Sequence, residues 1–408
     1  MSLAPTGTVG LLVVGGGPAA HAAAAAYRGA GGPGTVLLVG DDDRPPYFRP
    51  ALSKDLLRSG DPTGTDDDGL LLEDLTGLDD VAIRVGTAVT ALSPAERRAR
   101  LADGTTVGFT ACVLATGAEP VPLPVPGADP ADGVVHLLRS LADARALLEG
   151  LSGAGSVVVV GSGFIGCEAA AALAGRGLTV TVCGTERVPQ AARLGDAVGD
   201  RLADWLSEAG VWLRGTAEVT GIDPTAGGRR VHVRDGHPVD ADVVLVAAGA
   251  RPRVSLAASA GLPVPGGRVV VDERMRTAVP GVLAAGDLVS ARNAAAGRHL
   301  AVEHWGDAEE MGRIAGTTAA GGDAVWDSPP GFWSDIGGRV LKYSAWGDGF
   351  DEVAVTTHPG GGFSAWYTRD GLLCGIATHQ ADDDLDTGSD LVRRNAPASS
   401  APGTPDTR

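Results

Sequence analysis

Short apolar runs and glycine-rich turns alternate along the chain. Residues 9–14 (VGLLVV) have the length and composition of a buried strand, and three glycines follow at 15–17. Residues 19–27 are rich in alanine, which favours a helix, and a second apolar run covers 35–39. This order predicts a strand, a tight turn, a helix and a second strand.

The same order returns in the middle of the chain. Residues 156–173 (SVVVVGSGFIGCEAAAAL) pass from an apolar run through a glycine turn into an alanine-rich segment, and a strand-like run follows at 178–183. Gly161, Gly163 and Gly166 take the three small-residue positions of this second turn. The sequence therefore predicts two units of the same α/β kind.

The spacing of small residues in both units is the GxGxxG/A of dinucleotide-binding folds. In the first unit, Gly15 permits the tight turn, Gly17 lets a pyrophosphate approach the backbone, and Ala20 lets the helix pack closely on the strand. Asp41 follows the second strand, where a carboxylate that binds a ribose belongs. Two such units suit an enzyme that passes electrons between two nucleotides.

The remaining pattern predicts further elements. Residues 81–89 and 100–109 alternate like strands, and the proline-rich segment 120–130 is typical of a stiff linker between domains. Residues 195–210 have the apolar spacing of an amphipathic helix, and 301–320 also indicates a helix.

Composition narrows the class of protein. The 408 residues carry a formal net charge of −17, which argues against nucleic-acid binding. No apolar run approaches the roughly 18 residues of a membrane helix, and no basic residue precedes the first strand, as it would in a cleaved signal. The four cysteines form no CxxC or CxxxxC pair, so we expect neither a redox disulfide nor a cysteine metal site. We expect a cytoplasmic protein that binds no membrane.

Several short motifs resemble, in order, those of one family. Residues 46–56 read PYFRPALSKDL, similar to the family's PYxRPPLSK, with Ala51 in place of its second proline. The family is that of the FAD-dependent ferredoxin reductases of bacterial oxygenase systems, relatives of putidaredoxin reductase, rubredoxin reductase and apoptosis-inducing factor, with a glutathione-reductase-like fold. The other motifs are ATGAEP at 115–120, the GxGxxG-xE from 161 to 168, AAGARP at 247–252, AAGD at 284–287, EHW at 303–305 and FWSD at 332–335.

The resemblance implies roles for individual residues. The FAD would be bound by Gly15, Gly17, Ala20, Asp41, Arg49, Thr116, Gly117, Gly286 and Asp287, and Gly249 would also bind a cofactor. The nicotinamide coenzyme would be bound by Gly161, Gly163 and Gly166. Lys54 would lie beside the flavin ring, paired with Glu168, and these two are the candidate catalytic residues. The residues near the nicotinamide and flavin rings would be Phe164, His304, Trp305 and Trp333.

The resemblance also implies an α/β fold with two Rossmann-like domains, one for FAD and one for NAD(P), and a small α+β C-terminal domain. The FAD-binding domain would be discontinuous, formed by 1–120 and 250–323, with the NAD(P)H-binding domain 121–249 inserted. Residues 324–380 hold four of the seven tryptophans and indicate a β-rich domain. Residues 381–408 are acidic and then rich in small and polar residues, so we expect a disordered tail.

The implied function is electron transfer from NAD(P)H through FAD to a small iron–sulfur ferredoxin that serves an oxygenase. Two alternatives stay open: a small-molecule acceptor such as a quinone or oxygen, and a redox sensor like apoptosis-inducing factor. An acidic ferredoxin would need a basic docking patch, for which the candidates are Arg292, Arg298, Arg313 and Arg339.

The sequence leaves the choice between NADH and NADPH open. An acid that binds the adenosine 2′-hydroxyl would be expected at Gly184. Glu186 could take over that role, whereas Arg187 could bind a 2′-phosphate. The lack of a larger arginine cluster slightly favours NADH.

Overall fold

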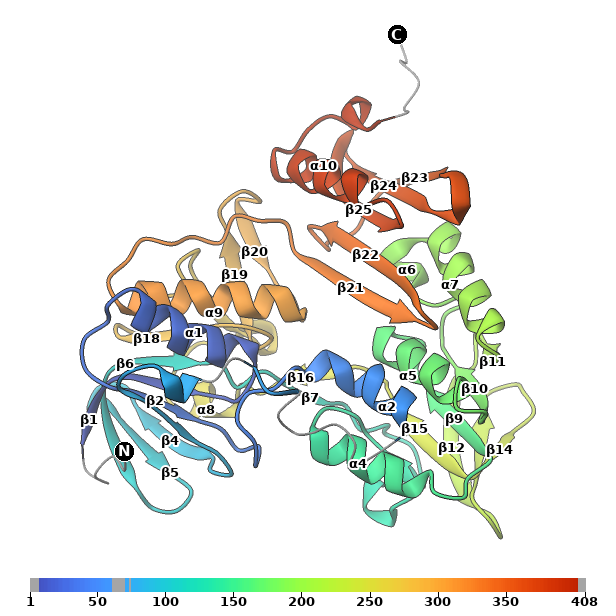
Figure 1. Cartoon of the computed structure of the whole chain (residues 1–408), viewed down its shortest axis with the longest axis horizontal. Coiled ribbons are helices and arrows are strands. Elements are labelled where there is room, and N and C mark those ends of the chain that lie inside the picture. Colours follow the sequence, from blue (N-terminus) through green and yellow to red (C-terminus); the bar gives the residue numbers. More distant parts are fainter. Residues whose placement is uncertain (1–6, 61–69, 73–74, 403–408) are drawn as a thin grey trace.

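The computed structural model describes residues 7–60, 70–72 and 75–402, and it has the predicted α/β architecture, with two mainly parallel sheets and a five-stranded antiparallel sheet near the C-terminus (Figure 1). Figure 1 shows β21, an edge strand of this C-terminal sheet, lying beside α5 of the second parallel sheet. No helix within the described ranges is both long and apolar enough to cross a bilayer.

The first sheet has the strand order β3-β2-β1-β6-β5-β4, with β18 paired to β6. Strands β1, β2, β3, β6 and β18 run parallel, whereas β4 and β5 are added antiparallel. The bounds of the strands are β1 Thr8–Val14, β2 Val36–Val39, β3 Val81–Arg84, β4 Val89–Ser93, β5 Arg98–Leu101, β6 Thr106–Leu114 and β18 Val282–Ala284. Because β18 comes from far along the chain, this sheet is built from two separate segments.

Two helices, α1 Pro18–Gly29 and α9 Trp305–Ala319, pack together on this sheet. The same segments of the chain also hold two short helices, α8 Ser255–Ser259 beside β4 and α2 Asp55–Ser59, which packs against α4 and α5. The 3-10 turns are η1 Arg49–Ser53, η2 Leu75–Gly77 and η4 Pro265–Gly267. A three-stranded sheet lies next to them, made of β17 Val269–Val271, β19 Val289–Asn293 and β20 Arg298–Leu300.

The second parallel sheet has the order β11-β10-β9-β15-β8, with an antiparallel three-stranded sheet beside it. The strands of the parallel sheet are β8 Val135–His136, β9 Ser156–Val160, β10 Thr179–Cys183, β11 Val211–Arg214 and β15 Val243–Val246. The smaller sheet contains β12 Val219–Pro224, β13 Arg229–Val233 and β14 Val239–Ala241. The helices are η3 Pro130–Asp132, α4 Leu141–Gly150, α5 Phe164–Ala174, α6 Ala191–Leu194 and α7 Asp196–Glu208.

The chain passes between the two parallel sheets twice, at β7 (Ala118–Pro120) and β16 (Ala250–Pro252). These short strands pair with each other antiparallel, so the two crossings lie side by side. The predicted helices at 195–210 and 301–320 are present as α7 and α9.

The terminal sheet is antiparallel, in the order β21-β22-β25-β24-β23. Its elements are β21 Gly331–Ile336, β22 Arg339–Ala345, β23 Glu352–Thr357, η5 Pro359–Gly361, β24 Phe363–Arg369 and β25 Leu372–His379. The expectation of a disordered tail is wrong for the described part of 381–408, because α10 (Asp382–Arg393) and η6 (Ala398–Ser400) follow the sheet.

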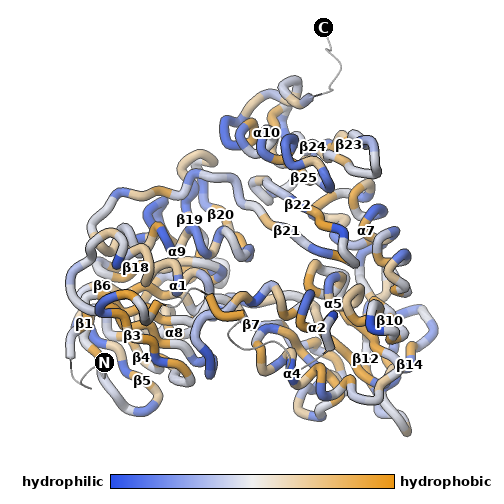
Figure 2. Tube along the Cα trace, in the orientation of Figure 1, coloured by the Kyte–Doolittle hydropathy of each residue, from blue (hydrophilic) through white to orange (hydrophobic). Residues whose placement is uncertain are grey.

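Helix α10 forms for a physical reason that is not evident from the composition of the segment. Its first turn holds three aspartates, which favour the positive end of the helix dipole. Val392 is buried, and Gly388 packs so closely on Ile376 that a Cβ there would lie 2.6 Å from the Ile376 side chain. Figure 2 shows α10 as a largely hydrophilic helix on the outside of the terminal sheet. One narrow face of small and apolar residues therefore packs this otherwise acidic helix on the terminal sheet.

Glycines let α9 cross α1 at very short distance. A Cβ on Gly312 would lie 2.2 Å from the Ala19 carbonyl oxygen, and one on Gly316 would lie 2.1 Å from that of Ala23. This contact packs α1, the helix that follows the glycine loop of β1, directly on α9 of the second segment.

Gly312→Ala is therefore expected to lower the free energy of unfolding by about 1–3 kcal/mol, the usual cost of overpacking a close contact. Gly29→Ala is the matched control, because Gly29 ends α1 with nothing within 4 Å of its added Cβ. Urea unfolding of both variants measures the difference. Equal stability of the two variants would contradict the close contact.

Candidate cofactor-binding and redox site

One cavity of about 1710 Å³ lies where the two parallel sheets and the terminal sheet meet. It exceeds the roughly 300–1,000 Å³ of ordinary small-molecule pockets, as a site for an extended dinucleotide and a second ligand requires. The predicted site residues that line it are Gly15, Gly17, Asp41, Arg49, Lys54, Thr116, Gly117, Phe164, Glu168, Gly286, Asp287, His304, Trp305 and Trp333.

The loop after β1 has the geometry of a pyrophosphate cradle. Gly15 has a φ of +140°, and its Cβ would lie 2.0 Å from the Ala115 carbonyl oxygen, so only glycine fits. Gly17 is the N-cap of α1, has no side chain to cap the helix, and would direct a Cβ into open space at the cavity. The start of α1 is thus open to a phosphate from the cavity side, and the residues present fit FAD.

The loop after β9 repeats this geometry at a separate place. Gly161 has a φ of +114°, and its Cβ would lie 2.3 Å from the Ala247 carbonyl oxygen. A Cβ on Gly166 would lie 2.1 Å from the Gly161 oxygen, which shows how closely α5 packs. Gly163 is the N-cap of α5, and the nearest atom to its added Cβ is the Gln190 side-chain nitrogen at 3.7 Å. A second phosphate site therefore fits here.

Not every predicted residue borders the large cavity. Gly161, Gly163 and Gly166 belong to the second loop, and Ala20 is buried in the core that α1 shares with the sheet. Gly249 also lies outside the lining, and its carbonyl accepts a hydrogen bond from the Val121 N–H. The structure therefore places Gly249 at a crossing between the sheets rather than at the cavity.

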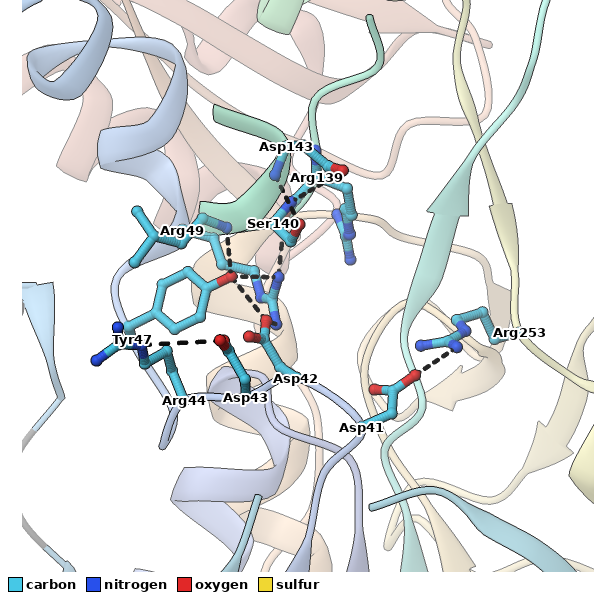
Figure 3. Close-up of polar contacts among 11 residues, drawn as sticks. Asp41, Asp42, Asp43, Arg44, Tyr47, Arg49, Arg139, Ser140, Asp143 and Arg253 are labelled. Atoms are coloured by element: carbon cyan, nitrogen blue, oxygen red, sulfur yellow. Dashed lines mark hydrogen bonds and ion pairs between the residues drawn. The ribbon is translucent and has the colours of Figure 1, made fainter. Parts of the chain in front are cut away.

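Carboxylates and arginines alternate at one end of the cavity (Figure 3). Arg253 Nη2 donates to Asp41 Oδ2 at 2.6 Å, while Asp42 Oδ2 accepts from Tyr47 Oη at 2.8 Å and from Arg49 Nη2 at 3.1 Å. Burial alone would raise the pKa of Asp41, but the hydrogen bond and charge of Arg253 outweigh it and lower that pKa overall. Asp41 therefore borders the cavity as an anion.

Tyr47 connects this end of the cavity to α4. Its hydroxyl donates to Asp42 and accepts from Arg49 Nη1 and from the Leu141 N–H, each at 2.9 Å. Burial raises the pKa of Tyr47, so the hydroxyl keeps its proton and remains a donor. Arg49 Nη1 also donates to the Arg139 carbonyl oxygen at 2.9 Å, which fixes the guanidinium at the cavity wall.

Arg139 is a cavity residue that the sequence reasoning missed. Its Nη2 donates to Asp287 Oδ2 at 2.8 Å. The carboxylate predicted to bind the ribityl chain is therefore paired with a cation from the segment between β8 and α4. Asp42 and Arg253 were missed in the same way. The one feature of the sequence that could have pointed to Arg139 is its place directly before Ser140, the N-cap of α4.

Lys54 and Glu168 meet at the wall of the cavity. Lys54 Nζ donates to Glu168 Oε2 at 2.7 Å, and the two side chains are 11% and 4% exposed. Ser53 Oγ donates to the same Oε2 at 2.5 Å, and Ser334 Oγ donates to Oε1 at 2.7 Å. Because 114 positions separate Lys54 from Glu168, this contact brings the PYFRPALSK motif and the second glycine unit together.

Aromatic rings surround this ion pair. Lys54 Nζ lies 4.7 Å from the centroid of Trp333, a distance typical of a cation–π contact. Phe48 packs edge-on against Trp305 and Trp333, with centroids 5.2 and 6.1 Å apart. Trp333 is 40% exposed, so it offers one face to the cavity region without being core.

His304 is held between two charged partners. Its Nδ1 lies 3.1 Å from Asp307 Oδ2, and its Nε2 lies 3.3 Å from Arg193 Nη1. Since a guanidinium only donates, Nε2 is the acceptor and Nδ1–H donates to Asp307. Phe332 packs against His304 and against Phe164, with centroids 4.9 and 4.4 Å apart. His304 and Phe164 thus meet through Phe332, whereas Trp333 lines the same cavity beside Phe48 and Lys54.

Gly184, where an acid specific for NADH would be expected, is tightly packed. A Cβ on Gly184 would lie 2.3 Å from Ser162 Oγ, so an acid cannot be placed there without moving Ser162. Glu186 Oε1 accepts from the Ala192 N–H at 2.7 Å. Arg187 is paired with Asp196 at 3.0 Å and with Asp200 at 2.8 Å.

The four arginines expected to form a basic patch do not form an unbalanced one. They belong to β19, β20, α9 and β22, and each has its own carboxylate partner. The pairs are Arg292–Glu273, Arg298–Asp348, Arg313–Glu310 and Arg339–Glu208. The four cysteines are buried and free, and burial raises the pKa of Cys112 and Cys167 to about 12, as expected of core thiols.

Comparison with known proteins agrees with this geometry. Residues 10–312 match the model of a family described as pyridine nucleotide-disulphide oxidoreductase. The chain is 37% identical over 300 residues to the ferredoxin–NAD(+) reductase component of an anthranilate 1,2-dioxygenase system from Burkholderia cepacia, covering 73% of this chain and 72% of the relative. It is 32% identical over 366 residues to a ferredoxin–NAD(P)(+) reductase from Sphingomonas sp, covering 86% and 84%.

Solved structures give the same result over nearly the whole chain. The ferredoxin reductase for the CYP199A2 system from Rhodopseudomonas palustris superimposes with a TM-score of 0.88 at 29% identity, covering 98% of this chain and 97% of the other. Putidaredoxin reductase in its covalent complex with putidaredoxin gives a TM-score of 0.87 at 28% identity, covering 95% and 94%. The chain therefore belongs to the pyridine nucleotide-disulphide oxidoreductase family, among its ferredoxin reductases.

Proposed function

We propose that this protein transfers electrons from NAD(P)H through FAD to a small iron–sulfur ferredoxin that serves an oxygenase, in the cytoplasm. The observation that carries the proposal is the Lys54–Glu168 contact, which joins the two glycine-loop units inside one cavity. A bound FAD would supply the hydride acceptor and the means of passing electrons on singly.

The FAD would occupy the cavity from the loop after β1 to the aromatic residues. In this proposal Gly15 and Gly17 hold its pyrophosphate, Asp41 or Asp42 binds its adenosine ribose, and Asp287 binds the ribityl chain, turning from Arg139 to it. The FAD-binding domain is then 1–120 with 250–323, and 121–249 binds the coenzyme.

Lys54 would act by electrostatics. Its ammonium is nearly buried and held by Glu168, so it is preorganised to stabilise negative charge that develops on a reduced ring beside it. Phe164 and Trp333 would flank the reacting rings and keep water out. None of these steps needs a cysteine, which agrees with four buried thiols.

Steady-state kinetics with three acceptors test the proposal. Turnover with NADH should be fastest when a ferredoxin such as putidaredoxin is the acceptor, and slower with a quinone or oxygen. Faster turnover with a quinone at every ferredoxin concentration would make the protein a small-molecule reductase instead.

Gly17→Ala should raise the dissociation constant of FAD about tenfold, because the added methyl group keeps a phosphate from the backbone. The unfolding midpoint of the FAD-free protein should stay that of the parent, since the added Cβ meets nothing within 4 Å. Fluorescence titration with FAD measures the affinity, and Gly29→Ala at the far end of α1 is the control. Unchanged affinity would place the pyrophosphate elsewhere.

Lys54→Met should slow flavin reduction by NADH about 10- to 100-fold while FAD stays bound, because a preorganised charge is lost from the reacting ring. Anaerobic stopped-flow absorbance measures the rate. Arg230→Met removes a cation that pairs with Asp240 on the surface and serves as the control. A parental rate in Lys54→Met would remove the electrostatic role.

NADH should be preferred to NADPH by about tenfold in kcat/KM, because Asp196 and Asp200 neutralise Arg187 and repel a further phosphate dianion. Asp200→Asn should then reduce the preference for NADH, because part of the positive charge of Arg187 is no longer neutralised. The ratio of the two kcat/KM values is the measurement. A preference for NADPH in the parent protein would contradict this arrangement.

A further inference from the structure

The carboxylate of Glu168 is surrounded by more donors than an ion pair with Lys54 needs. Oε2 accepts from Lys54 Nζ at 2.7 Å and from Ser53 Oγ at 2.5 Å, and Oε1 accepts from Ser334 Oγ at 2.7 Å. Glu168, Ser53 and Ser334 are 4%, 5% and 0% exposed, so little water reaches these contacts. Both oxygens are thereby fixed by protein donors.

Physical chemistry gives these hydroxyls a definite effect. A buried carboxylate costs several kcal/mol in lost hydration unless donors replace the water, and a single lysine contacts only one of its two oxygens here. Ser334 supplies the donor for the other oxygen, and Ser53 restrains the shared one. Hydrogen bonds to a charged acceptor are roughly twice as strong as neutral ones, so the carboxylate plane is held firmly.

The donors and their acceptor come from three distant parts of the chain. Ser53 ends η1 and Lys54 follows it, Glu168 lies on α5 of the second glycine unit, and Ser334 lies in the middle of the terminal strand β21. Lys54 Nζ is also 4.7 Å from the centroid of Trp333, the neighbour of Ser334. The position of the ammonium therefore depends on both the second unit and the terminal sheet.

We propose that Ser53 and Ser334 are positioning residues for flavin reduction, which orient the Glu168 carboxylate and through it place the Lys54 ammonium at the flavin. Ser334 makes this placement conditional on the terminal sheet being docked against α5. The inference rests on the proposed function, because it concerns the same redox site.

The test compares Ser53→Ala and Ser334→Ala with Ser334→Thr, which keeps the hydroxyl, and with Ser364→Ala as the matched control. Ser364 is also a fully buried serine of the terminal sheet that donates to a carboxylate, Asp384 at 2.5 Å, but it does not line the cavity. Two readouts are taken: the midpoint potential of the bound flavin, and the rate of its anaerobic reduction by NADH together with the NADH dissociation constant.

Ser334→Ala and Ser53→Ala should each lower the flavin midpoint potential and slow reduction about tenfold, with the NADH dissociation constant nearly unchanged, because the charge beside the ring is less well placed. Ser334→Thr should restore both values toward those of the parent. Ser364→Ala should leave both values unchanged. If Ser334→Ala does not fold, Ser53→Ala carries the same test from the other side of the carboxylate.

Two results would overturn the inference. Parental potentials and rates in both alanine variants would show that the hydroxyls do not place the ammonium, and equal losses in Ser364→Ala would show a general effect of the terminal sheet. A parent protein that NADH does not reduce would instead contradict the proposed function, so the two failures are distinguishable.

Discussion

The contact between Lys54 and Glu168 is the interaction on which the rest of the site depends. An ammonium and a carboxylate, both nearly buried, are stable together only if their partners are complete, since removing either leaves an uncompensated charge. The sheet order, the crossing at β7 and β16, and the placement of β21 all serve to bring 53–54, 168 and 334 to one point. The fold thus brings the residues of this small polar cluster together.

The two glycine loops supply the complementary constraint, the first at the cavity and the second outside its lining. Each leaves a helix N-terminus without a side-chain cap, and each packs its turn so closely on the neighbouring strand that no side chain fits. Exposed N–H groups and the positive ends of two helix dipoles favour phosphate at both places. In the proposed function, two anionic dinucleotides approach one centre from these separate anchors, with Lys54 as the cation between them.

The sequence was informative where a local backbone requirement selects the residue. Gly15 and Gly161 could be assigned because their positive φ values and close carbonyl contacts exclude other residues. Arg139 and Ser334 could not be assigned, because their partners Asp287 and Glu168 are 148 and 166 positions away. Composition misled at the C-terminus, where α10 forms despite its acidity. The basic patch was expected from the charge of an acidic partner rather than from composition, and acids pair with all four of its arginines.

In the proposed function, both nucleotide units act on one redox centre beside Lys54. The most direct test is anaerobic mixing of the FAD-loaded protein with NADH, followed by absorbance at the flavin bands and at long wavelengths. Rapid and complete bleaching in a single turnover is expected. A flavin that stays oxidised, or a long-wavelength band that persists while bleaching is slow, would contradict the proposed function and favour a redox sensor.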